Sequence, residues 1–159
     1  MANAQSTRSF GPTKAQRDRI NRLALDARAM RLYPDADPCA YCGVIANSVD
    51  HVPPRSQRDR LVALGLALQY DFFEVPACRE CNSVLGARPL WTLRERRAYI
   101  KRMLKRRYAD VLKIPDWTDS ELAQMSPMMQ TYILNGIEVR EFIRQRVQYH
   151  ELSRGSRVA

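Results

Sequence analysis

Long apolar runs are missing from this sequence, and their absence excludes one class of protein. Nowhere do about 18 apolar residues follow one another, the length that a membrane-spanning helix needs. The first residues, MANAQSTRSFGPTK, contain no continuous apolar stretch of the kind that directs secretion. We therefore expect no membrane partner and a cytoplasmic, reducing environment, in which structural disulfides are rare.

Acidic residues are scarce relative to basic ones. The 159-residue chain has 26 lysines and arginines against 17 aspartates and glutamates, which gives a formal charge of +9. Excess positive charge favours a polyanionic partner, because Lys and Arg that neutralise phosphates release condensed counterions. Nucleic acid is thus the first candidate partner, although basic proteins of other functions share this composition. The length and the apolar fraction of 45% are those of one globular domain.

The four cysteines form two pairs with CxxC spacing. Cys39 and Cys42 lie in CAYC, and Cys78 and Cys81 lie in CREC. A reducing compartment disfavours disulfides, and a thioredoxin-like redox centre would leave one pair unexplained. Zinc accounts for both pairs, because four thiolates satisfy tetrahedral Zn²⁺ and CxxC lets two sulfurs from one turn reach the ion. The alternative is two unrelated reduced pairs.

Hydrophobic periodicity predicts a mostly helical α+β protein in five segments. A disordered tail (residues 1–12) precedes an amphipathic N-terminal helix (13–37), whose regular part runs from Thr13 to about Tyr33. A zinc-bound core (38–90) follows, then a helical extension (91–150) and a second tail (151–159). The extension begins with a long, basic helix. A capping box at Thr118 and Glu121 opens the next helix, another starts near Pro127 and breaks at Asn135-Gly136, and the last spans residues 139–150.

Between the cysteine pairs the pattern predicts short strands. The segment VIANSVDHV has the composition of two strands joined by a turn at Asn47 and Ser48. LVALGLAL favours a short buried helix, and DFFEVPA favours an extended segment. The second cysteine pair is expected to open a helix that continues to about Leu85.

The order of the motifs resembles a known family. CxxC, then Asp-His followed by proline, then CxxC-Asn is similar to the four-cysteine zinc branch of the HNH, or ββα-metal (His-Me finger), endonucleases, including the endonuclease VII-like members. The resemblance covers about residues 38–86. It implies a treble-clef-like hairpin and helix clamped by a structural zinc ion, and a second divalent ion, Mg²⁺ or Mn²⁺, for hydrolysis of DNA. Asp50 and Asn82 would bind that ion, and His51 would be the general base.

The chemistry of these residue types agrees with the implied roles. A neutral imidazole with a pKa near about 6.5 can accept a proton from water at neutral pH. Carboxylate and amide oxygens suit Mg²⁺ or Mn²⁺ better than thiolates do. Family members usually carry an asparagine or histidine shortly before the second cysteine pair. This chain has neither, and Asp71 and Glu74 are the polar residues there.

Each functional assignment has a plainer alternative. His51 could be an ordinary hydrogen-bonded histidine, and Asn82 could cap local backbone groups. The basic residues could be a solvated surface, or they could contact nucleic acid, for which the candidates are Arg55, Arg79, Arg97, Lys101, Arg102, Lys105 and Arg106. For the whole chain, the alternative to an endonuclease is a degenerate HNH-like module without catalysis that binds nucleic acid or a protein partner. Small proteins of this kind are often phage-encoded, which would place the chain in a bacterial or infected-host cytoplasm.

We predict that purified protein contains about one zinc ion per chain, and that Cys78→Ser impairs folding, because structural zinc contributes folding free energy of order 10 kcal/mol. Metal analysis and thermal unfolding of wild type and variant measure both effects. A metal-free preparation with unchanged thermal stability would contradict the zinc prediction.

Overall fold

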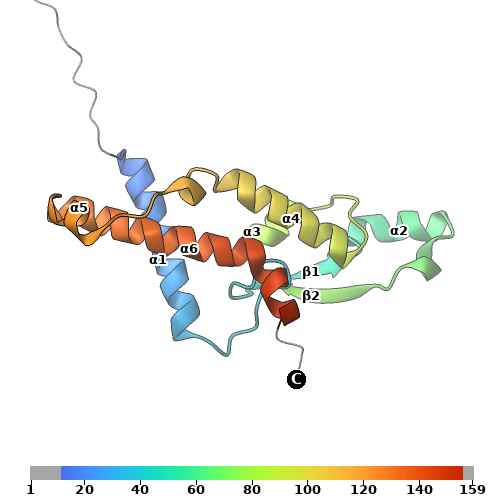
Figure 1. Cartoon of the computed structure of the whole chain (residues 1–159). Helices are drawn as coiled ribbons and strands as arrows, with labels where there is room; N and C mark the ends of the chain where they lie inside the picture. The colour runs from blue at the N-terminus through green and yellow to red at the C-terminus, as the bar shows by residue number, and fades with distance from the viewer. Residues whose placement is uncertain (1–11, 156–159) are drawn as a thin grey trace, which may run out of the picture.

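The computed structural model describes residues 12–155, with side chains as far as Tyr149. Within this part the chain is mostly helical and has one sheet of two antiparallel strands. A long helix, α6 (Pro127–Gly155), runs along the molecule, with the sheet near one end and α5 (Asp119–Ala123) near the other (Figure 1). The predicted tails lie outside the described residues except for Pro12 and the last turn of α6. None of the described helices is long and apolar enough to cross a membrane.

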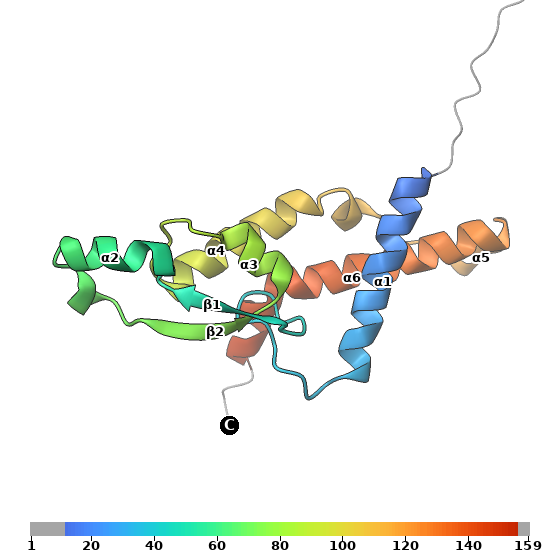
Figure 2. The ribbon, with the colours of Figure 1, turned by 180° about the vertical axis from the view of Figure 1, so that it is seen from behind.

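The N-terminal helix forms as its sequence predicts. Helix α1 (Lys14–Leu32) starts after Thr13, whose hydroxyl accepts the Gln16 backbone N–H in a capping box. The buried side chains of α1 lie at three-and-four spacing and are Ile20, Leu23, Ala24 and Ala27. This apolar stripe packs against α6, which α1 crosses in both views (Figures 1 and 2).

The strand pairing differs from the prediction. Strand β1 (Ser48–Val52) pairs with β2 (Phe73–Ala77), the segment expected to be extended. Residues 44–46 form no strand, and Ile45 makes only an isolated bridge to Pro38. The prediction of a hairpin within residues 44–52 was therefore wrong, because local alternation does not reveal a partner that lies more than twenty residues further along the chain.

Two helical segments connect the strands, and the elements from α3 onward follow the sheet. Helix α2 (Arg55–Ala63) and the 3-10 turn η1 (Ala67–Gln69) lie between β1 and β2. Helix α3 (Arg79–Leu85) begins directly after Cys78, as expected for the second cysteine pair. The basic helix α4 (Leu93–Arg107) opens with a capping box, and the turn η2 (Val111–Lys113) follows it. The capping box of Thr118 and Glu121 at α5 is confirmed.

Helix α6 does not break at Asn135-Gly136. Gly136 is buried inside the continuous helix, and a Cβ added there would lie 3.3 Å from Ile114 Cδ1. The glycine therefore permits close packing of α6 against the segment after α4, and this packing outweighs its low helix propensity. The buried core connects α1, the first cysteine turn, the sheet, α3, α4 and α6.

Alanine substitutions at two glycines with positive φ can test whether Tyr149 of α6 packs against the first cysteine turn. Gly43 has φ +75° and a Cβ there would overlap the Tyr149 ring, whereas Gly65 has φ +67° and open space around it. Gly65→Ala should cost about 1–2 kcal/mol for the left-handed backbone, and Gly43→Ala about 1–3 kcal/mol more for displacing the ring. Urea unfolding of both variants measures the difference. Equal losses of stability would show that Tyr149 does not touch this turn in solution.

Candidate functional site

The four cysteine sulfurs come together in one buried cluster. All four Sγ atoms lie within 4.8 Å of one another. Cys42 Sγ is 3.8 Å from Cys78 Sγ and 3.5 Å from Cys81 Sγ. These distances are too long for a disulfide, and they are close to the separation of about 3.8 Å that Zn–S bonds of about 2.3 Å impose in a tetrahedron. The cluster could hold a zinc ion, and the prediction that both pairs share one site is confirmed.

Local backbone geometry builds each half of the cluster. In the first turn, the Cys39 backbone N–H donates to Val44 O at 2.7 Å, and the Gly43 N–H donates to Cys39 O at 2.9 Å. The positive φ of Gly43 allows this tight reversal. In the second, Cys78 is the N-cap of α3 and its Sγ accepts the Cys81 N–H at 3.4 Å. Each CxxC therefore directs two sulfurs toward one point.

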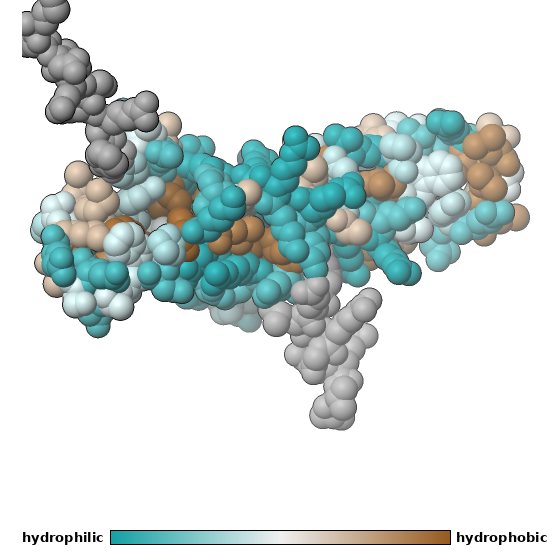
Figure 3. Space-filling model, turned by 45° about the horizontal axis from the view of Figure 1, so that its top comes forward, coloured by the Kyte–Doolittle hydropathy of each residue, from teal (hydrophilic) through white to brown (hydrophobic). Residues whose placement is uncertain are grey.

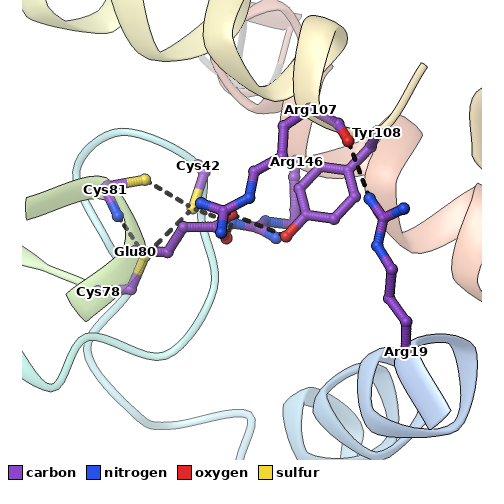
Figure 4. A network of polar contacts seen from close by, with 8 residues as sticks. All are labelled: Arg19, Cys42, Cys78, Glu80, Cys81, Arg107, Tyr108 and Arg146. Atoms are coloured by element: carbon purple, nitrogen blue, oxygen red, sulfur yellow. Dashed lines mark hydrogen bonds and ion pairs between the residues drawn. The ribbon is translucent and has the colours of Figure 1, made fainter. Parts of the chain in front are cut away.

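An ion-pair network lies next to the sulfurs (Figure 4). Glu80 lies between the second cysteine pair; its Oε2 accepts from Arg146 Nη2 at 2.6 Å and its Oε1 accepts from the Tyr108 hydroxyl at 2.7 Å. Arg107 Nη1 lies 3.2 Å from Oε1. Burial alone would raise the pKa of Glu80, but Arg146, Tyr108 and Arg107 together hold it below its usual value. Burial and the neighbouring Glu80 raise the pKa of Tyr108 to about 12.

Asp50 is directed into the interior and is fully engaged. Alternation along β1 places it with Val52 on the buried face of the sheet. Arg96 Nη2 donates to Asp50 Oδ1 at 2.7 Å, Arg96 Nε donates to Oδ2 at 2.9 Å, and the Tyr41 hydroxyl also donates to Oδ2. The Arg96 side chain is 0% exposed. A guanidinium thus holds the carboxylate where the family resemblance implies a divalent ion.

His51 lies on the opposite, outer face of the sheet. Its Nε2 is 2.9 Å from Oε1 of Glu74, its cross-strand partner, although the two are not aligned for a hydrogen bond. The side chain is 30% exposed. His51 and Glu74 border a hollow of about 130 Å³ together with Arg55 and Arg58. Of the two acids before the second cysteine pair, Glu74 is therefore the one beside His51.

Asn82 is placed at a different part of the surface. Its Nδ2 donates to Val49 O at 3.1 Å and to Ser48 Oγ at 3.4 Å, so the side chain ties α3 to β1. It borders an open hollow with Ser48, Arg79 and Ser83 rather than the hollow of His51. Asp50 and Asn82 share no polar partner, and in this arrangement they do not fit a divalent ion held between them. Their roles as metal ligands, and that of His51 as base, stay predictions.

The candidate nucleic-acid contacts divide into two groups. Arg55, Arg79, Arg102, Lys105 and Arg106 are exposed, as a contact with nucleic acid requires. Arg97 and Lys101 are only partly exposed. The Arg97 Nε donates to Ala40 O at 3.0 Å, which ties α4 to the first cysteine turn. The sequence predicted Arg97 as a surface contact for nucleic acid. The first cysteine turn, which packs against Arg97, lies 57 positions away in the chain, so the local pattern does not reveal it.

Comparisons of the chain with protein-family models, with curated proteins and with solved structures give no match.

The Asp50 and Arg96 pair predicts a stability effect that a metal ligand would not show. Asp50→Ala should lower the free energy of unfolding by about 3–5 kcal/mol, because it leaves a buried guanidinium unpaired. Asp50→Ala combined with Arg96→Met should lose less than the sum of the two single variants. Exposed Asp59→Ala, the control, should stay within about 0.5 kcal/mol of wild type. Denaturant unfolding of the metal-loaded proteins makes the comparison, and unchanged stability of Asp50→Ala would refute the pairing.

Proposed function

We propose that this chain is a DNA-binding protein built on a zinc-clamped, treble-clef-like HNH core, and that Arg96 takes the place of the catalytic ion. The observation that carries the binding function is a set of exposed basic side chains on one helix without acidic partners. The motif order of residues 38–86 supports the HNH core, and the buried four-cysteine cluster supports the zinc clamp.

Helix α4 carries the unpartnered charge. Four of its exposed basic residues, Arg94, Arg102, Lys105 and Arg106, form no ion pair with any residue of the described part, whereas Arg107 pairs with Glu80. Some exposed arginines elsewhere are paired with acids: Arg28 and Arg31 both pair with Glu138, and Arg144 pairs with Glu141. Uncompensated charge of this kind favours a polyphosphate backbone, whose binding releases counterions. The side of the molecule on which α4 lies is largely hydrophilic (Figure 3).

Arg102 of α4 and the nearby Arg88 both make cation–π contacts with the ring of Tyr99. The guanidinium carbons of Arg88 and Arg102 lie 4.9 Å and 5.3 Å from the centre of the Tyr99 ring. Tyr99, Arg102 and Arg106 follow at three-and-four spacing, so they lie on one face of α4. The ring holds two like charges at one place without an acidic partner, and a phosphate group would relieve their repulsion.

The interior favours binding over hydrolysis. Metal-assisted hydrolysis needs an ion with open positions for water and a phosphate oxygen. Arg96 provides positive charge at Asp50 but offers no coordination position, and three donors already occupy the carboxylate. The degenerate HNH-like module is therefore the function that the geometry supports best.

A metal-dependent DNA endonuclease is the second candidate, and His51 is the observation that favours it. The imidazole is partly exposed beside a carboxylate, and Arg55 and Arg58 border the same hollow. A base placed next to a carboxylate and near groups that can bind phosphate is suited to remove a proton from water. Hydrolysis by this route would need Asp50 to exchange Arg96 for Mg²⁺ or Mn²⁺.

We predict that replacing Arg102, Lys105 and Arg106 by alanine weakens DNA binding at all sequences. The slope of log affinity against log salt should also fall by about 0.9 for each phosphate that the variant no longer neutralises. Arg28, Arg31 and Arg144 replaced by alanine form the control, which removes the same charge from paired positions. Fluorescence anisotropy with single- and double-stranded DNA over a salt series measures both variants.

Two outcomes of this titration would contradict the proposal. Wild-type protein that shows no DNA affinity at low salt would refute the binding function and leave a protein partner. Equal reductions of affinity in both triple variants would refute the proposal that DNA binds to α4, because the loss of affinity would then depend on net charge alone.

A cleavage assay separates the two candidates. Supercoiled plasmid incubated with wild type and Mg²⁺ or Mn²⁺ should remain intact if Arg96 closes the ion site. Cleavage that needs the added ion, and that His51→Ala reduces by about 10² to 10⁴-fold with DNA affinity retained, would establish the endonuclease instead. Asp50→Asn is the companion variant, because loss of cutting at unchanged stability would mark it as an ion ligand rather than the partner of Arg96.

A further inference from the structure

A buried arginine from the C-terminal helix touches the cysteine cluster. Arg146 Nη2 lies 3.6 Å from Cys42 Sγ, a hydrogen-bond distance for sulfur, and the two residues are 104 positions apart in the chain. The Arg146 side chain is 5% exposed. Its guanidinium lies against the rings of Tyr108 and Phe142, at 5.8 Å and 5.6 Å from their centres. In Figure 4 the Arg146 side chain extends toward Cys42 and Glu80.

The position of this guanidinium matches the charge of a loaded zinc centre. Four thiolates around Zn²⁺ leave a net charge of about −2, and burial of that charge is costly without a compensating cation. An N–H donor from a cation to sulfur both compensates charge and fixes the orientation of the ligand, as outer residues do at other metal sites. Glu80 alone would add negative charge beside the sulfurs, but Arg146 and Arg107 both neutralise it.

We propose that Arg146 is an outer residue of the metal centre, which donates to the Cys42 thiolate and stabilises the bound ion. Through this interaction the zinc centre and the docking of α6 support each other. The inference does not depend on DNA binding or on hydrolysis, because it concerns only the metal centre and the helix that touches it.

Zinc release provides the first test. Arg146→Met keeps much of the apolar length of the side chain but removes the charge and the donor. We expect it to transfer zinc to a chromogenic chelator about 10- to 100-fold faster than wild type, the usual effect of removing a residue that supports a metal ligand. Arg140→Met is the matched control: Arg140 is also 5% exposed on α6, but it pairs with Asp116 and Ile114 O, away from the cysteines. It should release zinc at less than about twice the wild-type rate.

Glu80→Gln separates a role toward the metal from a merely structural ion pair. The amide still accepts a hydrogen bond from Arg146, but it removes the negative charge that competes with the thiolates for the guanidinium. If Arg146 acts on the metal centre, zinc release from Glu80→Gln should be as slow as from wild type, or slower, even where the variant unfolds more easily. Release that is accelerated as much as in Arg146→Met would overturn the proposal, because both variants would then act only by loosening α6.

The optical spectrum of the Co²⁺-substituted protein gives a measurement that does not depend on folding stability. A donated N–H lowers the energy of the thiolate lone pairs, so removal of this donor should shift the thiolate-to-cobalt charge-transfer band to lower energy. We expect this shift in Arg146→Met and none in Arg140→Met. Identical spectra in wild type and Arg146→Met, or equal zinc release from the Arg146 and Arg140 variants, would refute the donation to Cys42. If Arg146→Met does not fold, the Co²⁺ spectrum of Glu80→Gln decides the question: stronger donation to Cys42 should shift the band to higher energy, and an unchanged band would refute the proposal.

Discussion

The meeting of four thiols at one buried point is the constraint on which the rest of this structure depends. A hairpin of two five-residue strands is marginal by itself in water, and α3 is a helix of seven residues. The cluster joins the turn before β1 to the junction between β2 and α3, and two helices of the extension then attach to it. Arg97 of α4 holds the carbonyl of Ala40 in the first turn, and Arg146 of α6 touches Cys42. The four cysteines thus lie where these segments of the core meet.

The same extension also supplies the partner of the buried carboxylate of Asp50. The family resemblance predicts Asp50 as an ion ligand, but α4 brings a fully buried guanidinium to it. Both arrangements satisfy a buried carboxylate, since either a divalent ion or a bidentate arginine compensates its charge. The two arrangements differ in the coordination positions that they offer. A divalent ion can also bind water and a phosphate oxygen, whereas the arginine offers no coordination position. A catalytic ion and Arg96 are therefore alternatives at one carboxylate.

The positive charge of the chain has two different uses, which composition cannot distinguish. Arg96, Arg140 and Arg146 are buried, and each is paired with an acid inside the fold. These residues add to the net charge of +9 but are not available to a partner. The exposed, unpaired residues of α4 belong to the part of that charge that can meet a polyanion, as do exposed arginines elsewhere such as Arg55 and Arg79. A basic composition therefore predicts a nucleic-acid partner only when the arginines that form buried ion pairs are left out of the count.

The sequence by itself determined the elements whose signals are local. Spacing within CxxC, the capping residues Thr13, Thr92 and Thr118, and the apolar stripe of α1 depend on neighbours a few positions away, so the pattern contains the information. Tertiary structure alone decided three matters: that β1 pairs with β2, that α6 continues through Gly136 because Ile114 packs against it, and that Asp50 faces Arg96 while His51 faces Glu74. Each of these depends on residues more than twenty positions apart, and one residue of shift along a strand moves a side chain to the opposite face. The motif therefore identified which residues are chemically able to act, whereas packing decided which of them remain open to a ligand.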